Sequence, residues 1–395
     1  MTLITWANTF FWVGVTTVFY TYVGYGGIIY FISRFRRRYR VPDQQEQADL
    51  PPVTFIVAAY NEAGFIVEKI RNTLGLDYPE DKLEVLFVTD GSTDETPEII
   101  KGFPRLRLFH SPERRGKIHA VNRVMEFVKN PIVIFSDANT LLNIGALKNI
   151  VRHYQYKNVG GVAGEKKINS QAKENASGAG EGLYWKYESF LKRKDSEVYS
   201  VVGAAGELFS VRTELYEVPE ADMIIEDFYL SLLIASRGYR FIYEPDAYAM
   251  ESASASVAEE WKRKVRICAG GFQAMLKLKH LLNPFRHGML TFQYFSHRVL
   301  RWTLAPLFLP IILIINIVLA LEGNPLYIVL LAIQLLFYFI AVSGFFLRDR
   351  RISIRGFFVP CYFGVMNLSV YAGFFRFLRG KQSVVWEKAR RAEKL

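Results

Sequence analysis

The sequence predicts an α/β fold with a mainly parallel central sheet, preceded and followed by transmembrane helices. Strand-like apolar runs alternate with helix-like segments from residue 53 onward, and strands separated by helices build parallel sheets through right-handed crossovers. Apolar residues also concentrate at both ends of the 395-residue chain, whereas residues 51–280 have an ordinary soluble composition. This middle portion, about 230 residues long, is large enough to bury a core of its own.

The first apolar segment, residues 10–32, predicts a transmembrane helix. No charged residue precedes Arg34, and the segment is long enough to cross a hydrocarbon core of about 30 Å. It is too long for a signal-peptide apolar region and lacks a basic start. The basic run RFRRRYR follows at once, so the positive-inside rule places the middle domain on the cytoplasmic side of the cell membrane.

The second apolar block predicts two further crossings, residues 303–321 and 326–347, joined by the tight turn EGNP. Residues 357–375 are ambiguous: both flanks are basic, which favours a re-entrant or interfacial segment, but a full crossing is the alternative. Residues 259–289 mix basic and apolar side chains, as amphipathic elements at the headgroup level do. The predicted divisions are 1–33 (membrane helix), 51–258 (catalytic domain), 259–300 (interfacial helices) and 301–380 (membrane segments).

Charge and cysteine content exclude several classes of protein. The net charge of +11 is concentrated in clusters beside the apolar runs, which is more typical of a cytoplasmic membrane face than of a nucleic-acid surface. The two cysteines and the scattered histidines have no metal-ligand spacing, which favours a reducing compartment and excludes a zinc framework. No G-x-G-x-x-G follows the first strand, so a Rossmann dehydrogenase is disfavoured.

Polar clusters follow three of the four predicted strands, residues 53–60, 84–90, 105–110 and 131–137. The clusters are AAYNE, DGSTDET and SDAN. In an open parallel sheet, ligands bind at the carboxyl ends of the strands, which is where these clusters should meet. Taken alone, DGSTDET equally fits a turn followed by a helix cap.

The combination predicts a site for a nucleotide diphosphate. Asp137 and Asn139 offer oxygen ligands to Mg²⁺ or Mn²⁺, and a divalent cation helps a diphosphate leaving group to depart. Lys117, in RRGK at a helix start, supplies a second cation. Asp90 can accept hydrogen bonds from a uracil or a ribose.

The ordered motifs AAYNE, DGSTDET, GKIHAVN and SDAN resemble those of family 2 glycosyltransferases with the GT-A fold. The likeness continues through GAAGELFSVR and IIEDFYLSL and covers most of residues 51–266. The flanking helices resemble the membrane-integrated branch, which includes cellulose, hyaluronan, chitin and poly-N-acetylglucosamine synthases.

The resemblance implies roles for individual residues. Asp227 matches the general base, Gly206 and Glu207 match a loop beside the sugar and the acceptor, and the nucleotide is usually UDP. The implied donor-binding residues are Ala59, Tyr60, Glu62, Asp90, Lys117, Asp137 and Arg266.

The chemistry of inversion agrees with one base, because the acceptor hydroxyl must lose its proton as it attacks. Asp227 begins a helical pattern over residues 227–236, where a helix N-terminus favours the ionised carboxylate. An N-capping role is the alternative for Asp227, and Glu226 is the alternative base.

One departure from the family's motifs affects the glycan product that the sequence predicts. Processive members of this branch carry Gln-x-x-Arg-Trp after the base, whereas residues 263–267 here read RKVRI and keep only the arginine, Arg266. The sequence therefore favours a metal-dependent hexosyl- or N-acetylhexosaminyltransferase that acts on a lipid-linked or membrane-proximal glycan acceptor. A processive exopolysaccharide synthase, which would need an oligomer to enclose a channel, is the first alternative. A non-catalytic UDP-binding membrane subunit is the second.

Overall fold

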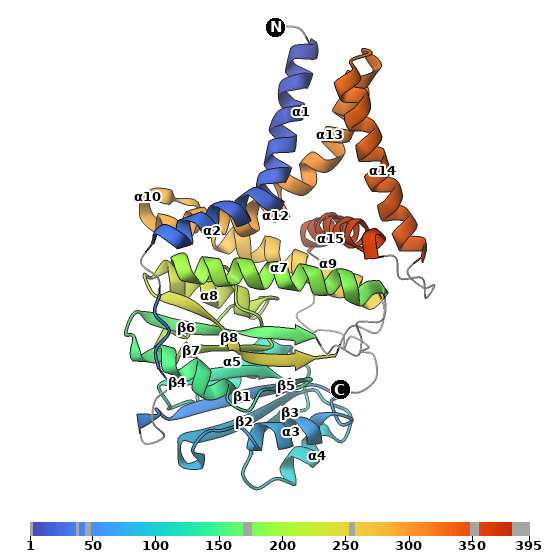
Figure 1. Ribbon diagram of the computed structural model, residues 1–395. Helices are drawn as coiled ribbons and strands as arrows, with labels where there is room; N and C mark the ends of the chain where they lie inside the picture. Colours follow the sequence, from blue (N-terminus) through green and yellow to red (C-terminus); the bar gives the residue numbers. More distant parts are fainter. Residues whose placement is uncertain are drawn as a thin grey trace.

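The computed structural model describes residues 3–36, 39–43, 49–168, 176–252, 257–347 and 355–380. Within them, an eight-stranded sheet has the order β3-β2-β1-β4-β7-β6-β8-β5 and forms the centre of the lower domain in Figure 1. Its first half is parallel, as the sequence predicts, because β1 pairs with β2 and β4, and β2 pairs with β3. The bounds are β1 Val53–Ala59, β2 Leu83–Asp90, β3 Arg107–Ser111 and β4 Ile132–Asp137.

The second half of the sheet is mixed. β7 is antiparallel to both β4 and β6, β6 is parallel to β8, and β5 is antiparallel to β8. Because β7 runs opposite to β4, Leu208 at its start pairs with Ser136 near the end of β4. The chain just before β7 therefore lies at the edge where the parallel strands end. The bounds are β5 Thr140–Leu142, β6 Val159–Ile168, β7 Leu208–Arg212 and β8 Arg240–Glu251.

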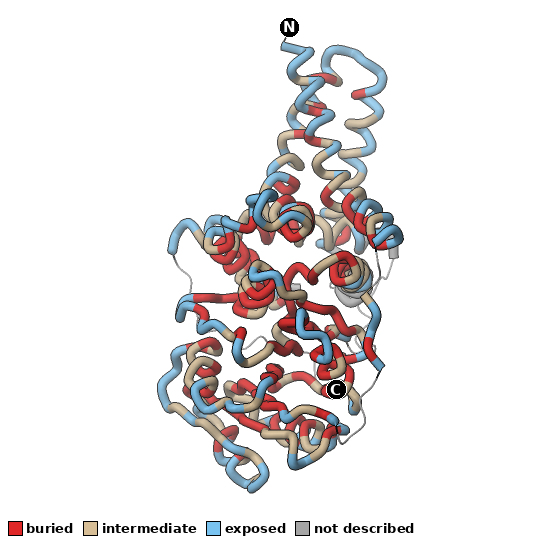
Figure 2. The backbone as a smooth tube through the Cα atoms, turned by 90° about the vertical axis from the view of Figure 1, so that its left-hand side faces the viewer, coloured by how far each residue is buried: buried red, intermediate tan, exposed pale blue. Residues whose placement is uncertain are grey.

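Helices cover both faces of the sheet, which explains why every residue of β1 except Thr54 is apolar. Phe55 and Val57 pack with α3 on one face, while Ile56 and Ala58 pack with α5 on the other. All seven residues of β1 are buried, and buried stretches run through the centre of the domain in Figure 2. The helices of this part are α3 Ile66–Leu74, α4 Thr96–Lys101, α5 Lys117–Met125 and α6 Ala146–Val151.

A third hydrophobic core joins the sheet domain to the helices above it. Phe228 and Leu232 of α8 (Glu226–Ser236) pack with Ala274 of α9 (Val257–Lys277) and Tyr294 of α11 (Met289–Tyr294) in a single buried cluster. The division that the sequence suggests at residue 258 therefore cuts through a shared core.

Among the residues that the structure describes, three helical stretches are long and apolar enough to cross a membrane: Leu3–Phe35, Leu304–Leu321 and Pro325–Phe346. The first is divided into α1 (Leu3–Phe19), a π-helix (Tyr20–Gly24) and α2 (Tyr25–Phe35). In Figure 1, α1 extends away from the domain together with α13 (Leu304–Leu321) and α14 (Pro325–Leu347), whereas α2 turns to lie over the domain. The segment predicted at residues 10–32 thus bends inside its apolar run.

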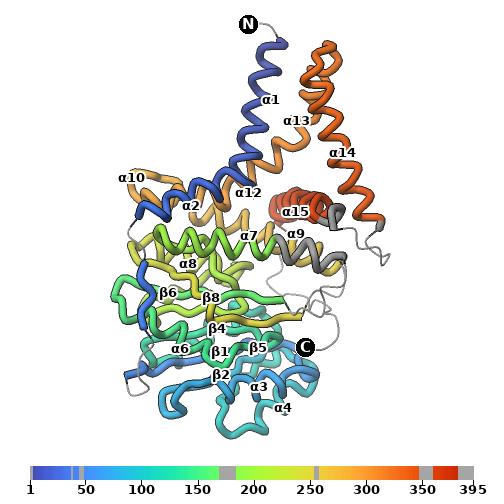
Figure 3. The backbone as a smooth tube through the Cα atoms, viewed as in Figure 1, coloured from blue at the N-terminus to red at the C-terminus, as the bar shows by residue number. Residues whose placement is uncertain are grey.

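A layer of helices lies between the sheet domain and the apolar helices. α7 (Ala176–Val198) runs along its lower side, and α15 (Arg355–Leu378) packs against α9 (Figure 3). A Cβ added at Gly373 of α15 would lie 2.5 Å from Cys268 Cβ of α9, which shows how closely the two helices approach. α15 contains the ambiguous residues 357–375, and it follows the surface of the domain rather than the direction of α13 and α14.

The remaining elements of this layer connect α9 to α13. They are α10 Pro284–His287, α11, a π-helix Phe295–Val299 and α12 Leu300–Trp302. Trp302 packs against Phe228 of α8, with ring centroids 5.4 Å apart, and lies over Gly271 of α9, where a Cβ would come within 2.5 Å of its ring. The layer is therefore packed directly onto the helix that begins with Glu226 and Asp227.

Candidate active site

The ends of β2 and β4 bring Asp90 and Asp137 to one edge of the sheet. Asp90 Oδ2 accepts hydrogen bonds from the backbone N–H groups of Arg115 and Gly116, at 2.9 and 2.5 Å. These bonds fix the loop that leads into α5. Gly116 has φ +101°, a left-handed conformation that a glycine adopts without strain, and it places Lys117 at the first position of α5.

Lys117 connects the end of β4 with the start of α8. Its Nζ donates to Asp137 Oδ1 at 2.8 Å and lies 3.1 Å from Glu226 Oε1. Burial disfavours the charged ammonium, but Asp137, Glu226 and Asp227 outweigh burial and raise the pKa of Lys117. One lysine thus balances three carboxylates from two segments that are far apart in the sequence.

Asp227 is the second residue of α8 and lies beside Glu226. Burial, followed by the neighbouring charge of Glu226, raises the pKa of Asp227 to about 7. Burial also raises the pKa of Asp137, although Lys117 opposes the shift. A carboxylate with a pKa near neutrality is suited to accept a proton from a hydroxyl group.

Gly206 and Glu207 approach this cluster from the chain that precedes β7. A Cβ added at Gly206 would lie 3.3 Å from Lys117 Nζ and 3.4 Å from Asp227 Oδ2. Glu207 forms an ion pair with Lys166. Burial alone would raise the pKa of Glu207, but Lys166 and then Arg263 lower it well below its usual range.

Lys166 and Glu251 are parts of the site that sequence reasoning missed. Lys166, on β6, also pairs with Glu251 at the end of β8, and Glu251 lies 3.9 Å from Arg263 on α9. This network ties the loop of Glu207 to α9. No local sequence motif predicts this network, because Lys166, Glu251 and Arg263 belong to three separate elements.

Arg266 faces the cluster from α9. Burial lowers its pKa, while Glu226, Asp137 and Asp227 act in the opposite direction. In the part of the chain that the structure describes, no group accepts a hydrogen bond from its buried Nε. The arginine that the resemblance singled out therefore points its charge at the carboxylates.

The loop after β1 contacts both the chain that follows β3 and the chain that follows β2. The guanidinium of Arg114 lies 3.8 Å from the ring centre of Tyr60, and the backbone N–H of Glu62 donates to Thr96 Oγ1 at 2.8 Å. Ala59 is buried as the last residue of β1. Tyr60 and Glu62 thus stand at the same sheet edge as Asp90, whereas Arg114 was not expected there.

Asn139 occupies the short turn between β4 and β5. Within this turn, Thr140 Oγ1 donates to the carbonyl of Asp137 at 3.0 Å, and the N–H of Ala138 donates to the carbonyl of Ala58 at 3.2 Å. The described residues contain no group of three or more His, Cys, Asp or Glu side chains arranged to hold a metal ion. A cation at Asp137 and Asn139 would need further ligands from a substrate.

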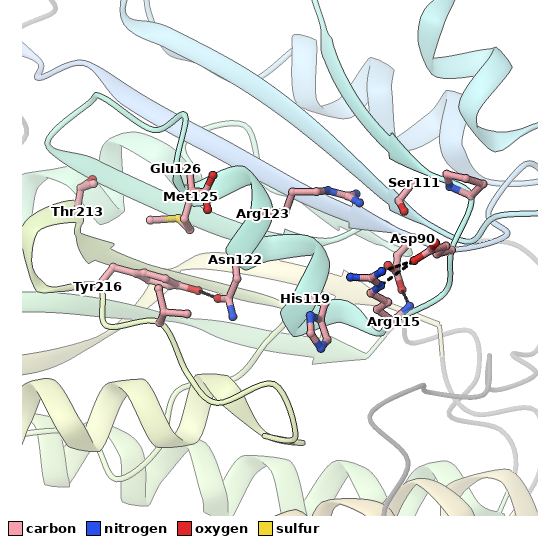
Figure 4. A pocket seen from close by; sticks show the side chains of 13 residues that line it. Asp90, Ser111, Arg115, His119, Asn122, Arg123, Met125, Glu126, Thr213 and Tyr216 are labelled. Atoms are coloured by element: carbon pink, nitrogen blue, oxygen red, sulfur yellow. Dashed lines mark hydrogen bonds and ion pairs between the residues drawn. The ribbon is translucent and has the colours of Figure 1, made fainter.

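A pocket of about 730 Å³ lies next to the cluster, between α5 and the chain after β7 (Figure 4). Asp90, Arg115 and His119 line one side, and Tyr216 lines the other, where its hydroxyl donates to Asn122 Oδ1 at 2.8 Å. Asp90 thus connects the carboxylate cluster to the exposed face of α5.

The sheet with its reversed β7, together with the carboxylates at the strand ends, defines a glycosyltransferase domain of the GT-A type. The sequence supports this class, because residues 54–218 match the family described as Glycosyl transferase family 2. Poly-beta-1,6-N-acetyl-D-glucosamine synthase of Staphylococcus aureus is 28% identical over 264 residues, which cover 64% of this chain and 62% of that protein. The Staphylococcus epidermidis protein of the same name is 28% identical over 267 residues, with the same shares.

Among solved structures, the mannosyltransferase PcManGT from Pyrobaculum calidifontis, in complex with GDP-Man and Mn²⁺, has a TM-score of 0.74. It is 23% identical and covers 95% of this chain and 99% of its own. The similarity of fold thus extends beyond the sheet domain to the apolar helices. The chain spans less than two thirds of the length of the two synthases.

Proposed function

We propose that this chain is an inverting glycosyltransferase that moves a hexosyl or N-acetylhexosaminyl group from a UDP-sugar to a lipid-linked or membrane-proximal glycan acceptor. The observation that carries the proposal is the convergence of Lys117, Asp137, Glu226 and Asp227 at one edge of the sheet. A single displacement at the anomeric carbon needs one base and a stabilised diphosphate. This cluster offers both.

Asp227 is the better candidate for the base. Glu226 is engaged by Lys117 at 3.1 Å and its side chain is only 10% exposed, whereas no ion pair joins Asp227 to a cation within 4 Å among the described residues. The raised pKa of Asp227, about 7, lets it take the acceptor proton near neutral pH. Glu226 then serves to raise that pKa.

Lys117 and Arg266 would hold the diphosphate. Both are cations directed at the carboxylates, and Arg266 has an N–H group available to a ligand oxygen. Guanidinium and ammonium groups pair strongly with phosphate oxygens. The stacked Tyr60 and Arg114, with Asp90 beside them, would receive the nucleoside.

Asp137 and Asn139 fit a hard cation such as Mg²⁺ or Mn²⁺, because both offer oxygen donors and the side chain of Asp137 is 32% exposed at the sheet edge. Mg²⁺ in such sites is bound by one or two carboxylates plus substrate phosphates, which agrees with the small donor set here. When bound, the cation offsets the charge of the leaving diphosphate.

The proposal places the sheet domain in the cytoplasm and α15 at the inner surface of the cell membrane. The basic residues between α2 and β1 support this side of the membrane. α15 packs along α9 on the domain side of the apolar helices. The acceptor would therefore be reached at the level of the membrane surface.

A screen of nucleotide-sugars for metal-dependent nucleotide release, followed by mass analysis of the lipid fraction, tests the proposal. We expect a UDP-sugar to be consumed and Asp227→Asn to bind it with unchanged affinity but to turn over at least 100-fold more slowly, the usual scale for a lost general base. Asp81→Asn, at an exposed carboxylate outside the cluster, is the matched control. Unchanged turnover in Asp227→Asn would remove Asp227 from the role of base.

A processive synthase is the second candidate, favoured by the names of the two staphylococcal relatives. With a radiolabelled donor, a discrete lipid-extractable product supports the leading proposal, and a long polymer supports the synthase. A non-catalytic UDP-binding subunit would bind UDP, form no product, and be indifferent to Asp227→Asn.

A further inference from the structure

A buried cluster of charges lies where the sheet domain meets the apolar helices. Glu188 of α7 accepts hydrogen bonds from Arg298 Nη2 and, at 3.0 Å, from Arg301 Nη1. Asp195 lies two turns further along α7. It is hydrogen-bonded to His297 Nδ1 at 2.6 Å and to the hydroxyl of Tyr25. One carboxylate, Glu188, therefore serves two arginines, since Asp195 is already occupied.

Arg301 is the incompletely satisfied member of this cluster. Its side chain is only 9% exposed. Among the residues that the structure describes, none accepts a hydrogen bond from its buried Nε or Nη2 atoms. These two nitrogens carry three of the five N–H groups of a guanidinium. Buried donors left unpaired destabilise a fold, so their presence indicates a ligand that takes them.

Tyrosine side chains of α7 and of the first apolar stretch lie near Arg301. Tyr22, Tyr184 and Tyr187 all lie near enough to act on its charge. Tyr22 donates to Asn367 Oδ1 of α15 at 2.6 Å, so this position lies between α7, α15 and the first apolar stretch. Lys264 of α9 lies 5.0 Å from the ring centre of Tyr184 and adds a second cation.

The position of Arg301 connects the membrane level with the catalytic cluster. It lies in α12, three residues before the apolar helix α13 begins at Leu304, and α12 stands at the foot of α13 in Figure 1. The next residue, Trp302, packs on Phe228, the neighbour of Asp227. A head group at Arg301 would have its apolar tail among the helices and its polar end toward the base.

We propose that Arg301 binds a phosphate group of a membrane lipid, and that this lipid is the acceptor; the second part rests on the proposed function. Phosphate is favoured because a planar guanidinium donates two parallel N–H bonds to it. Glu188 is shared by both arginines, so Arg301 has N–H groups left for a second anionic partner.

The test measures binding to the full-length protein in a neutral detergent, without donor or metal. The probes are dodecyl phosphate, dodecanol with the same chain, and inorganic phosphate. The variants are Arg301→Gln and Arg301→Lys. The lysine variant keeps a cation for Glu188, and hence the fold, but lacks the planar fork. Arg286→Gln, at an exposed arginine on α10 in the same layer, is the matched control.

We expect dodecyl phosphate to bind the wild type and Arg286→Gln equally, and to bind both Arg301 variants at least tenfold more weakly. UDP affinity should be the same in all four proteins. Wild-type affinity in Arg301→Lys and Arg301→Gln would overturn the site, and equal binding of dodecanol would overturn recognition of phosphate. Equal binding of inorganic phosphate would overturn the lipid part and indicate a soluble anion.

The outcomes separate this site from the proposed function. Binding of dodecyl phosphate through Arg301, without nucleotide release from any donor, would support the lipid-phosphate site and contradict the proposed transfer. Release of UDP, with binding of the probe that does not depend on Arg301, would support the proposed transfer and contradict the lipid-phosphate site.

Discussion

Lys117 Nζ stands between Asp137 Oδ1, at 2.8 Å, and Glu226 Oε1, at 3.1 Å. One ammonium group therefore joins the end of β4 to the start of α8, two segments separated by about ninety residues of sequence. Its replacement leaves buried carboxylates close together without a counter-charge.

Lys117→Met should weaken binding of the nucleotide-sugar at least tenfold, because the diphosphate and the carboxylates both lose a cation. Isothermal titration with UDP measures the effect. Lys101→Met, at an exposed lysine whose side chain is 60% accessible, is the control and should bind normally. A dissociation constant unchanged by Lys117→Met would contradict the donor-binding role.

The rate should rise with pH through about 7, because Asp227 must be ionised to act as a base and its pKa is raised to about 7. Glu226→Gln removes the charge that, after burial, contributes most to this shift. The rising limb of the kcat profile should then move to lower pH. A limb at the wild-type position in Glu226→Gln would mean that another group titrates.

Gly206→Ala should reduce turnover by about one order of magnitude, because its Cβ would be only 3.3 Å from Lys117 Nζ and 3.4 Å from Asp227 Oδ2. The site must then shift by a few tenths of an ångström. Gly64→Ala, where a Cβ meets nothing within 4 Å, should keep full activity. Equal rates in the two variants would show that the loop of Gly206 is not close-packed against the reacting groups.

Lys69 should act as a positioning residue for the turn that carries Asp137 and Asn139. It is fully buried, burial lowers its pKa to about 7, and its Nζ donates to Ser136 Oγ at 2.8 Å and to the carbonyl of Thr140 at 2.9 Å. Lys69→Met leaves two buried acceptors without a donor, at about 1–3 kcal/mol each.

We expect Lys69→Met to weaken Mn²⁺-dependent binding of UDP severalfold while metal-free binding stays unchanged. Titrations with and without Mn²⁺ separate the two, with Lys101→Met again as the control. A parallel loss in both titrations would indicate general destabilisation rather than positioning of the turn.

The parallel half of the sheet was readable from the sequence because its strands are buried on both faces and appear as continuous apolar runs. β1, β2 and β4 begin or end within one residue of prediction, and β3 begins two residues later than predicted. Asp90 and Asp137 lie at the same edge of the sheet, because parallel strands end at one edge.

The mixed half of the sheet could not be predicted from the sequence. β6 contains Gly160, Gly161 and Gly164, and a β-bulge interrupts its pairing with β8, which contains Pro245. Both features weaken a strand pattern. α7 was missed because its buried charges, Glu188 and Asp195, depend on partners about a hundred residues away. The Lys166 network escaped prediction for the same reason.

The hydrophobic core that Phe228 and Leu232 share with Ala274 and Tyr294 determines the smallest piece of this chain that can fold. A soluble fragment that stops after β8 would expose one whole side of α8 to water, and with it the helix turn that carries Asp227. Crystallographic or kinetic work on the isolated sheet domain would therefore need residues through α11, although the apolar helices α13 and α14 lie beyond that limit. The segment that unfolds cooperatively is therefore longer than residues 54–218, the part of the chain that matches the family.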